Sequence, residues 1–243
     1  MAIYGDYLKI VKRIINKKGE QKIFGVVIVI IALGLVLRLI SFNQSFWLDE
    51  SISAKMARMS FSQINQFIKS DFNPPLYYYI INLWGNIFGN SEIALRIPSL
   101  IFGLGAIGLI FIIGRLFLNH HAKLSALLLA TAPLHIYYSQ EARAYSLTVF
   151  TVLTAAYFFL KSLNNKKYYF LWSLSLPIMI FNHYQTFFFL PVFGIIFWWK
   201  NNKKSHLNRW RIWRPFLISF LPLLILFLFY RPIFQKQLLM GQG

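Results

Sequence analysis

The 243-residue sequence contains no cysteine, and only 13% of its residues are charged. Without cysteine, the chain forms no disulfide and offers no thiolate to a metal ion. Soluble domains carry roughly 25% charged residues, so this sequence has about half of the charge expected for a surface exposed to water. Acidic residues are the scarcest, with seven Asp and Glu against 25 Lys and Arg. These shortages argue against a soluble enzyme.

The sequence also lacks the glycine-rich loops that bind nucleotide phosphates and the His-Glu-x-x-His pattern of zinc enzymes. Coupling to nucleotide hydrolysis within this chain is therefore not expected. The net charge of +18 would suit nucleic acid in a polar protein. In a chain that is 57% hydrophobic, basic loops that face anionic lipid explain the charge better. We expect the lipid bilayer as a partner and no nucleic acid.

Long apolar segments take the place of charge. A membrane-spanning helix needs roughly 20 apolar residues, with a range near 17–25. Seven segments approach this length with almost no charge, namely 25–40, 97–113, 124–138, 146–160, 168–181, 186–199 and 215–230. The first is too long for a signal peptide and lacks its cleavage site. The sequence therefore predicts an all-α, polytopic transmembrane bundle of about seven spans, with residues 23–230 as the transmembrane domain.

The distribution of charge predicts the orientation. Lys and Arg concentrate in residues 1–22 and in the alternate connections around 115–123, 161–167 and 200–214, which places these segments in the cytoplasm. The outer side then holds the loop 42–96, two tight turns and the tail 231–243. Five of the seven acidic residues fall there: Asp49, Glu50, Asp71, Glu92 and Glu141. This clustering is independent of the orientation rule, because Asp and Glu contribute little to topology.

The outer loop 42–96 is predicted to form amphipathic helices that lie on the outer membrane face. Segments 51–59 and 60–68 begin with serine, which favours helix starts. The prolines of Asn73-Pro74-Pro75 interrupt the chain, and Pro75 suits the first position of a helix over 76–88. The aromatic residues of that helix suit the headgroup region.

Charged residues in or near this outer region are candidates for chemistry. Asp49 either accepts a proton from a hydroxyl group or is a solvated acid at a helix start, and Glu50 is its neighbour. Glu141 and Arg143 lie near membrane depth, where ionisable residues are costly and suggest function, although a mutual ion pair also explains them. Further candidates, each with an alternative structural role, are Arg96 and Arg38 as phosphate ligands and His183 as a metal ligand or proton carrier.

Four motifs in series resemble the GT-C glycosyltransferases, in particular the protein O-mannosyltransferase and aminoarabinose-transferase type (glycosyltransferase family 39). They are Phe46-Trp47-Leu48-Asp49-Glu50-Ser51, Asn73-Pro74-Pro75-Leu76-Tyr77-Tyr78, Leu95-Arg96-Ile97-Pro98-Ser99 and the segment Tyr138 to Tyr145, which reads YSQEARAY. The second departs from the commoner pattern, because Asn73 stands where relatives have histidine.

The resemblance implies a multi-pass enzyme of the plasma membrane that takes a sugar from a polyprenyl-phosphate donor. The sugar passes, with inversion, to a glycan, lipid or protein acceptor at the extracytoplasmic face. Asp49 matches the catalytic base and Glu50 its support, and Asp49 with Glu141 matches the ligands of a divalent cation in some relatives. Arg143, together with Arg96 and Arg38, is expected to bind the donor phosphate. Residues expected to line the cavity are Asn73, Tyr77, Tyr78, Tyr138, Gln140, Tyr145 and His183.

Two other classes of protein remain open on the residues alone. A transporter or flippase of lipid-linked or small anionic substrates would show inverted repeats, and none is evident. A non-catalytic scaffold would use the outer acids only as solvated loop residues. Relatives usually continue with further spans, so the tail 231–243 is expected to be where a longer family chain is cut short.

Overall fold

The computed structural model describes residues 23–71, 73–117, 121–201 and 213–240. Within these ranges all regular structure is helical, and no strand is present, which confirms the expected all-α class. The helices are the first helix Ile23–Leu39, α2 Leu48–Ala57, α3 Phe61–Ile68, α4 Leu76–Phe88, α5 Glu92–Phe117, α6 Ala122–Thr131, α7 Pro133–Ser139, α8 Tyr145–Ser162, α9 Tyr168–Asn182, the 3₁₀ turn η2 Tyr184–Phe188, α10 Phe189–Asn201 and α12 Leu221–Met240. The basic segment 1–22 and most of the basic connection 200–214 lie outside the described residues.

Three described helices are long and apolar enough to cross a membrane: Glu92–Phe117, Tyr145–Ser162 and Trp213–Ile233. The helices Ile23–Leu39 and Ala122–Thr131 are apolar but shorter. The count of about seven spans therefore stays a prediction. The expected continuous helix over 124–138 is wrong, because the chain breaks between α6 and α7. Pro133 causes the break, since it has no N–H to donate to the preceding turn.

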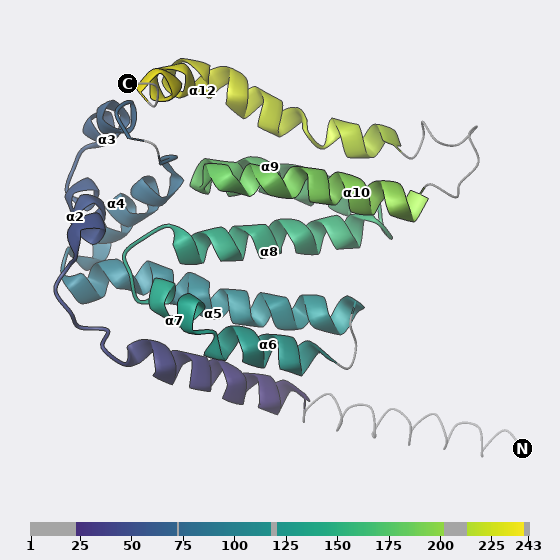
Figure 1. Cartoon of the computed structure of the whole chain (residues 1–243), viewed down its shortest axis with the longest axis horizontal. Coiled ribbons are helices and arrows are strands. Elements are labelled where there is room, and N and C mark those ends of the chain that lie inside the picture. Colours follow the sequence, from purple (N-terminus) through teal and green to yellow (C-terminus); the bar gives the residue numbers. More distant parts are fainter. Residues whose placement is uncertain (1–22, 72, 118–120, 202–212, 241–243) are drawn as a thin grey trace, which may run out of the picture.

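Figure 1 shows the long helices running side by side as a bundle, while α2, α3 and α4 gather at one end of it. The turn between α7 and α8 and the end of α9 lie at that same end. Local sequence explains the short helices. Ser60 caps α3 through a reciprocal capping box with Gln63, and Gly89 ends α4 at a φ of 90° that favours glycine. The three helices of this outer loop form a cap, which we call the helical cap.

An apolar cluster fixes the helical cap on the bundle. It joins buried residues of α2, α3 and α4 to the start of α5 and to Leu147 of α8; among them are Met56, Ile64, Ile81 and Leu95. A second, aromatic cluster surrounds the fully buried Trp172 of α9, which packs against Phe159 of α8 and Phe193 of α10. Aromatic pairs of this kind contribute roughly 0.5–1.5 kcal/mol each. The bundle and its cap are therefore one packed unit.

Candidate active site

A buried ion pair joins the first turn of α2 to the first half of α5. Arg96 Nε and Nη2 donate to the two carboxylate oxygens of Glu50 at 2.8 and 2.6 Å, and the Glu50 side chain is only 1% exposed. The other guanidinium hydrogens go to the carbonyls of Phe42, Gln44 and Ser45. All five N–H donors of Arg96 are thus occupied by protein acceptors.

Glu50 also reaches the turn between α7 and α8, residues 140–144, which we call the second outer turn. Its Oε1 accepts a hydrogen bond from the backbone N–H of Ala142 at 2.8 Å. Because Glu50 holds both Arg96 and this turn, it fixes three segments that are far apart in the sequence. Both side chains expected to support catalysis or bind phosphate are therefore fully engaged within the fold.

Asp49 and Arg143 come from separate outer segments and meet at the surface of the cap. Their Oδ2 and Nη2 atoms are 3.4 Å apart, and Arg143 Nη1 also donates to the Asp49 carbonyl at 3.2 Å. The Asp49 side chain is 35% exposed and that of Arg143 is 12% exposed. The carboxylate is therefore accessible from solvent, while its partner lies inside the protein.

A polar pocket lies beside this pair. Its lining comes from α2, the Asn73-Pro74 segment, α4, the second outer turn and the end of α9: Ser53, Asn73, Pro74, Tyr77, Tyr78, Arg143, Ala144, Tyr145, Asn182 and His183. We call it the polar pocket. It brings together six of the residues singled out from the sequence, namely Asn73, Tyr77, Tyr78, Arg143, Tyr145 and His183.

Hydrogen bonds hold the aromatic walls of the polar pocket. The hydroxyl of Tyr77 bonds with Ser99 Oγ at 3.2 Å, and Ser99 in turn donates to the Arg143 carbonyl at 3.1 Å. The hydroxyl of Tyr78 donates to Asp71 at 2.7 Å, and the Asn73 amide donates to the other oxygen of the same carboxylate. The Asn-Pro-Pro segment is thereby tied to α4 through Asp71.

Glu141 lies close to the charged pair without lining the pocket. Its side chain is buried, and one carboxylate oxygen, Oε2, has no hydrogen-bond partner. Burial raises the pKa of Glu141, and the negative charges of Glu50 and Asp49 raise it further. The hydrogen bond from Tyr137 and the charge of Arg143 lower it in part. Burial and the charge of Arg143 lower the pKa of His183, so its imidazole is neutral near pH 7.

Arg38 lies elsewhere, between the first helix and the break at Pro133. Its guanidinium is fully buried and donates to the carbonyls of Ala130 at 3.0 Å and Leu129 at 3.4 Å. It also contacts His135 Nδ1 at 2.6 Å. These carbonyls end α6, where Pro133 leaves them without their usual helical donors. Arg38 therefore replaces the helix bonds that the proline removes.

Gln140 and Tyr138 flank the second outer turn outside the polar pocket. The Gln140 amide donates to the carbonyls of Arg38 and Ile40, and so attaches the turn to the end of the first helix. Tyr138 packs on Tyr145 with ring centroids 4.2 Å apart. Both residues therefore support the walls of the site.

Four pocket residues were not among the predicted site residues: Ser53, Pro74, Ala144 and Asn182. Ser53 follows Asp49 by one helical turn, which puts both on one face of α2. This spacing was the one available signal for Ser53. Asn182 precedes His183, but only the packing of α9 on α8 shows which of the two side chains is buried.

A divalent cation finds few ligands here. Among the described residues, no group of three or more His, Cys, Asp or Glu side chains lies close enough to hold a metal ion. The expected pair, Asp49 and Glu141, supplies two carboxylates, and one of them faces the Arg143 guanidinium. This donor set does not fit a resident metal ion.

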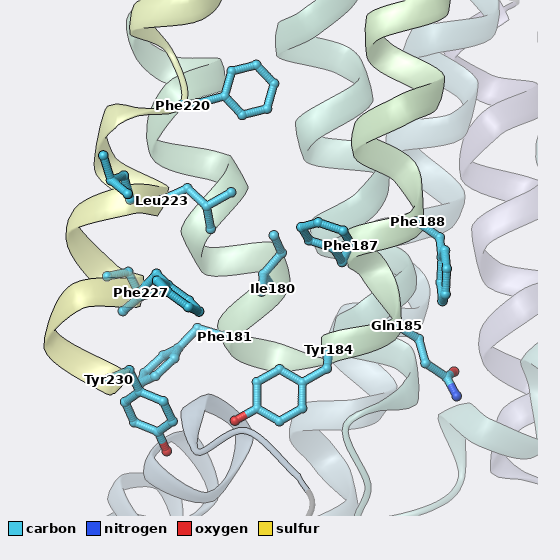
Figure 2. Close-up of a pocket in the computed structure, with 12 residues that line it drawn as sticks. Ile180, Phe181, Tyr184, Gln185, Phe187, Phe188, Phe220, Leu223, Phe227 and Tyr230 are labelled. Carbon is cyan, nitrogen blue, oxygen red and sulfur yellow. The ribbon is translucent and has the colours of Figure 1, made fainter. Parts of the chain in front are cut away.

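An apolar groove begins next to the polar pocket. It measures about 730 Å³ and lies between α9 with η2 and α12. Figure 2 shows Tyr184 and Tyr230 at one end of it and Phe220 at the other, and nearly all other lining residues are Phe, Leu or Ile. His183 lines the polar pocket and the next residue, Tyr184, lines the groove. The two sites are therefore contiguous along the chain; we call this second site the lipid-facing groove.

Comparison with known proteins identifies the class. A match to a mannosyltransferase family model places the chain among the membrane glycosyltransferases of the GT-C type, as the motifs had indicated. Residues 73–230 match the model of the dolichyl-phosphate-mannose-protein mannosyltransferases, and the chain belongs to that family. No curated protein and no solved structure matches. Asp49 and Glu50 precede the matched segment, so their roles depend on geometry.

Proposed function

We propose that this protein transfers a sugar from a polyprenyl-phosphate donor to an acceptor hydroxyl at the extracytoplasmic membrane face. The observation that carries the proposal is the meeting of Asp49 and Arg143 beside the polar pocket, next to a groove of lipid character. Such a displacement needs a carboxylate at the attacking hydroxyl and a guanidinium at the leaving group. One accepts the proton of the acceptor, and the other faces the leaving phosphate.

Asp49 is the base in this scheme. Its exposed oxygen accepts the proton of the acceptor hydroxyl while the oxygen of that hydroxyl attacks the anomeric carbon. The bond from this carbon to the phosphate oxygen breaks in the same step, and polyprenyl phosphate leaves with the electron pair. A single displacement inverts the anomeric carbon. Because the Asp49 side chain is accessible from solvent, an acceptor can reach it from outside the membrane.

Arg143 is the phosphate ligand. Its guanidinium lines the polar pocket and is mostly buried, where a charge–charge interaction is much less screened than in water. This guanidinium stabilises the developing negative charge of a leaving phosphate that lies outside the pocket. Arg96 and Arg38 have different roles in this proposal. All donors of Arg96 are taken by protein acceptors. Arg38 donates to the carbonyls of Ala130 and Leu129, although its Nε has no partner. Both therefore hold the loops and helices that position Asp49 and Arg143.

The lipid-facing groove receives the polyprenyl chain. Its apolar lining suits a hydrocarbon. The adjacency of Tyr184 in the groove to His183 in the polar pocket supports a phosphate bound near Arg143. Residues 23–230 form the transmembrane domain with about seven crossings of the plasma membrane. The helical cap then lies on the extracytoplasmic face and the segment 1–22 in the cytoplasm, as the basic connections favour.

Asp49→Asn tests the proposal because it keeps the shape of the side chain and removes the base. The assay follows release of polyprenyl phosphate from polyprenyl-phosphate hexoses in membrane vesicles that contain the protein, and this release can be measured whatever the acceptor is. Loss of a proton acceptor should lower turnover roughly 10²–10⁴-fold. Glu92→Gln is the matched control, because Glu92 is an outer acid at the start of α5 that does not line the polar pocket.

Folding is checked by size-exclusion chromatography in detergent for each variant. Turnover of Asp49→Asn equal to that of the native protein would remove Asp49 from the mechanism. A native protein that releases no polyprenyl phosphate above vesicles without it, for any hexose donor, would contradict the transferase activity itself.

A further inference from the structure

The polar pocket contains buried polar atoms that the fold leaves without partners. Ser53 Oγ, Asn182 Oδ1 and His183 Nδ1 all lack a hydrogen-bond partner, and all three residues line the pocket. Ser53 is fully buried and Asn182 is 1% exposed. A buried polar group without a hydrogen bond is destabilising, and three in one pocket are unusual for a structure in which most are satisfied. Such atoms indicate a ligand.

The direction of the Asn182 amide is fixed by its surroundings. Its Nδ2 donates to Thr148 Oγ1 at 2.7 Å and to the Ala144 carbonyl at 3.4 Å, both on the neighbouring α8 segment. The reverse orientation would set the amide oxygen against the Ala144 carbonyl, which has no hydrogen to donate. The free atom of Asn182 is therefore an acceptor, and it needs a donor from the ligand.

Size and charge restrict what that donor is. The open space in the pocket is about 20 Å³, which is just above the 10–15 Å³ that a single water needs. A hydroxyl group has the same size, whereas a phosphate or acetamido group does not fit. A cation is disfavoured by Arg143 in the same wall, and an anion has no hydrogen for Asn182 Oδ1. A neutral hydroxyl, which both donates and accepts, satisfies Asn182 and Ser53 together.

We infer that Ser53 and Asn182 form a subsite that binds one hydroxyl group of the donor sugar and so selects among sugars. This inference rests on the proposed function, since it places one hydroxyl group of the donor sugar in the polar pocket beside the paired Asp49 and Arg143. Ser53 lies one turn after Asp49 on the same face of α2, so a hydroxyl held by Ser53 orients the sugar ring relative to the base. Sugars with a bulkier substituent at that ring position are excluded by the size of the pocket.

A cycle that combines protein variants with deoxy donors tests the subsite. Native protein and Ser53→Ala are compared on polyprenyl-phosphate mannose and on its 2-, 3-, 4- and 6-deoxy analogues, with kcat/KM from release of polyprenyl phosphate. Removal of the Ser53 hydroxyl should lower kcat/KM for the parent donor roughly 10- to 100-fold. For one of the four deoxy donors the variant should equal the native protein, because the hydroxyl it would bind is already gone.

Ser51→Ala is the matched control. Ser51 lies on the same helix, is exposed and donates to the Trp47 carbonyl, so its removal should not change the deoxy profile. Asn182→Leu provides the second variant. Asn182→Leu should no longer distinguish the parent donor from the same deoxy donor that Ser53→Ala no longer distinguishes. This variant also loses the hydrogen bond to Thr148.

Two outcomes would overturn the inference. If Ser53→Ala shows the same relative loss on all five donors, the pocket atoms bind only an ordered water. If Ser53→Ala and Asn182→Leu lose discrimination at different ring positions, they do not form one subsite. Both outcomes leave sugar transfer by the native protein intact, and they are therefore distinct from failure of the proposed function, in which the native protein releases no polyprenyl phosphate at all.

Discussion

The guanidinium of Arg38 closes the break between α6 and α7, and a double-mutant cycle with Pro133 tests that role. In Arg38→Met the side chain keeps an unbranched apolar stem, but it is shorter and loses every donor. The carbonyls of Leu129 and Ala130, now paired with Arg38, would then lie unpaired in a buried and apolar part of the bundle. Each unpaired carbonyl costs about 1–3 kcal/mol. The expected loss of unfolding free energy is therefore about 2–6 kcal/mol.

Pro133→Ala should change how much unfolding free energy is lost in Arg38→Met. An alanine supplies the N–H that the proline lacks, and this N–H can bond to the Leu129 carbonyl in a continuous helix. Arg38→Met should then cost less in the Pro133→Ala background, because one of the two carbonyls has recovered a partner. The predicted coupling energy between the two positions is about 1–3 kcal/mol.

The assay is reversible unfolding in mixed detergent micelles for the native protein, both single variants and the double variant. Arg58→Met serves as the control, since Arg58 is exposed at the end of α2 and surface changes usually stay within about 0.5 kcal/mol. Additive effects, with a coupling below about 0.5 kcal/mol, would refute the idea that Arg38 compensates for the proline. Arg38 would then need another explanation, such as a role in binding phosphate.

Three further predictions address the site and its supports. Glu50→Gln should cost about 3–5 kcal/mol of unfolding free energy, because it leaves Arg96 as an uncompensated buried charge; an unchanged detergent unfolding midpoint would contradict this. Burial raises the pKa of Glu141 above its ordinary 4.5, so the folded protein binds the proton more tightly than the unfolded chain and loses stability as the pH rises past 4.5. Glu141→Gln should therefore gain stability relative to the native protein as the pH rises from about 4 to 7, and thermal unfolding across that range that shows a constant or shrinking difference would reject the sign. Leu223→Trp, in the wall of the lipid-facing groove, should raise KM for a long-chain donor but not for a two-isoprene donor, whereas Leu228→Trp, exposed on the same helix and not in the wall, should change neither; equal effects on both donors would argue against lipid binding there.

The helices could be predicted from the sequence because their signals are local. Apolar segments, a capping serine at Ser60 and the glycine at Gly89 each act within a few residues, and α4 has the bounds that were expected. The break at Pro133 was missed for the opposite reason. A run of apolar residues dominates the pattern there, and the compensation that makes the break tolerable comes from Arg38, which is far away in the sequence.

The candidate site divides in the same way. The residues Asn73, Tyr77 and Tyr78 lie together in one short motif, and their meeting with Arg143 followed from the family resemblance. Whether an arginine is free or occupied is not a local property. Arg38, Arg96 and Arg143 look alike in sequence, and only their hydrogen-bond partners separate them. Ser53 and Asn182 carry no motif, and they become informative only once their partners are found to be missing.

In the proposed mechanism, the contrast among the three arginines explains why Arg143 is the one that meets the donor phosphate. Arg96 is neutralised by Glu50. Arg38 is held by backbone carbonyls and by His135, with only its Nε left unpaired, so the fold already compensates most of the cost of both charges. Arg143 is compensated only in part, by an acid at 3.4 Å that is itself open to solvent. A phosphate that approaches Arg143 therefore competes with a partly exposed ion pair and a hydrogen bond to the Asp49 carbonyl. At Arg96 it would have to displace a buried bidentate pair and three carbonyls. The same Glu50–Arg96 pair that makes Arg96 unreactive also fixes the backbone of Asp49 and of the turn that carries Arg143. In this proposal Arg38 and Arg96 serve the fold, and Arg143 remains available for substrate.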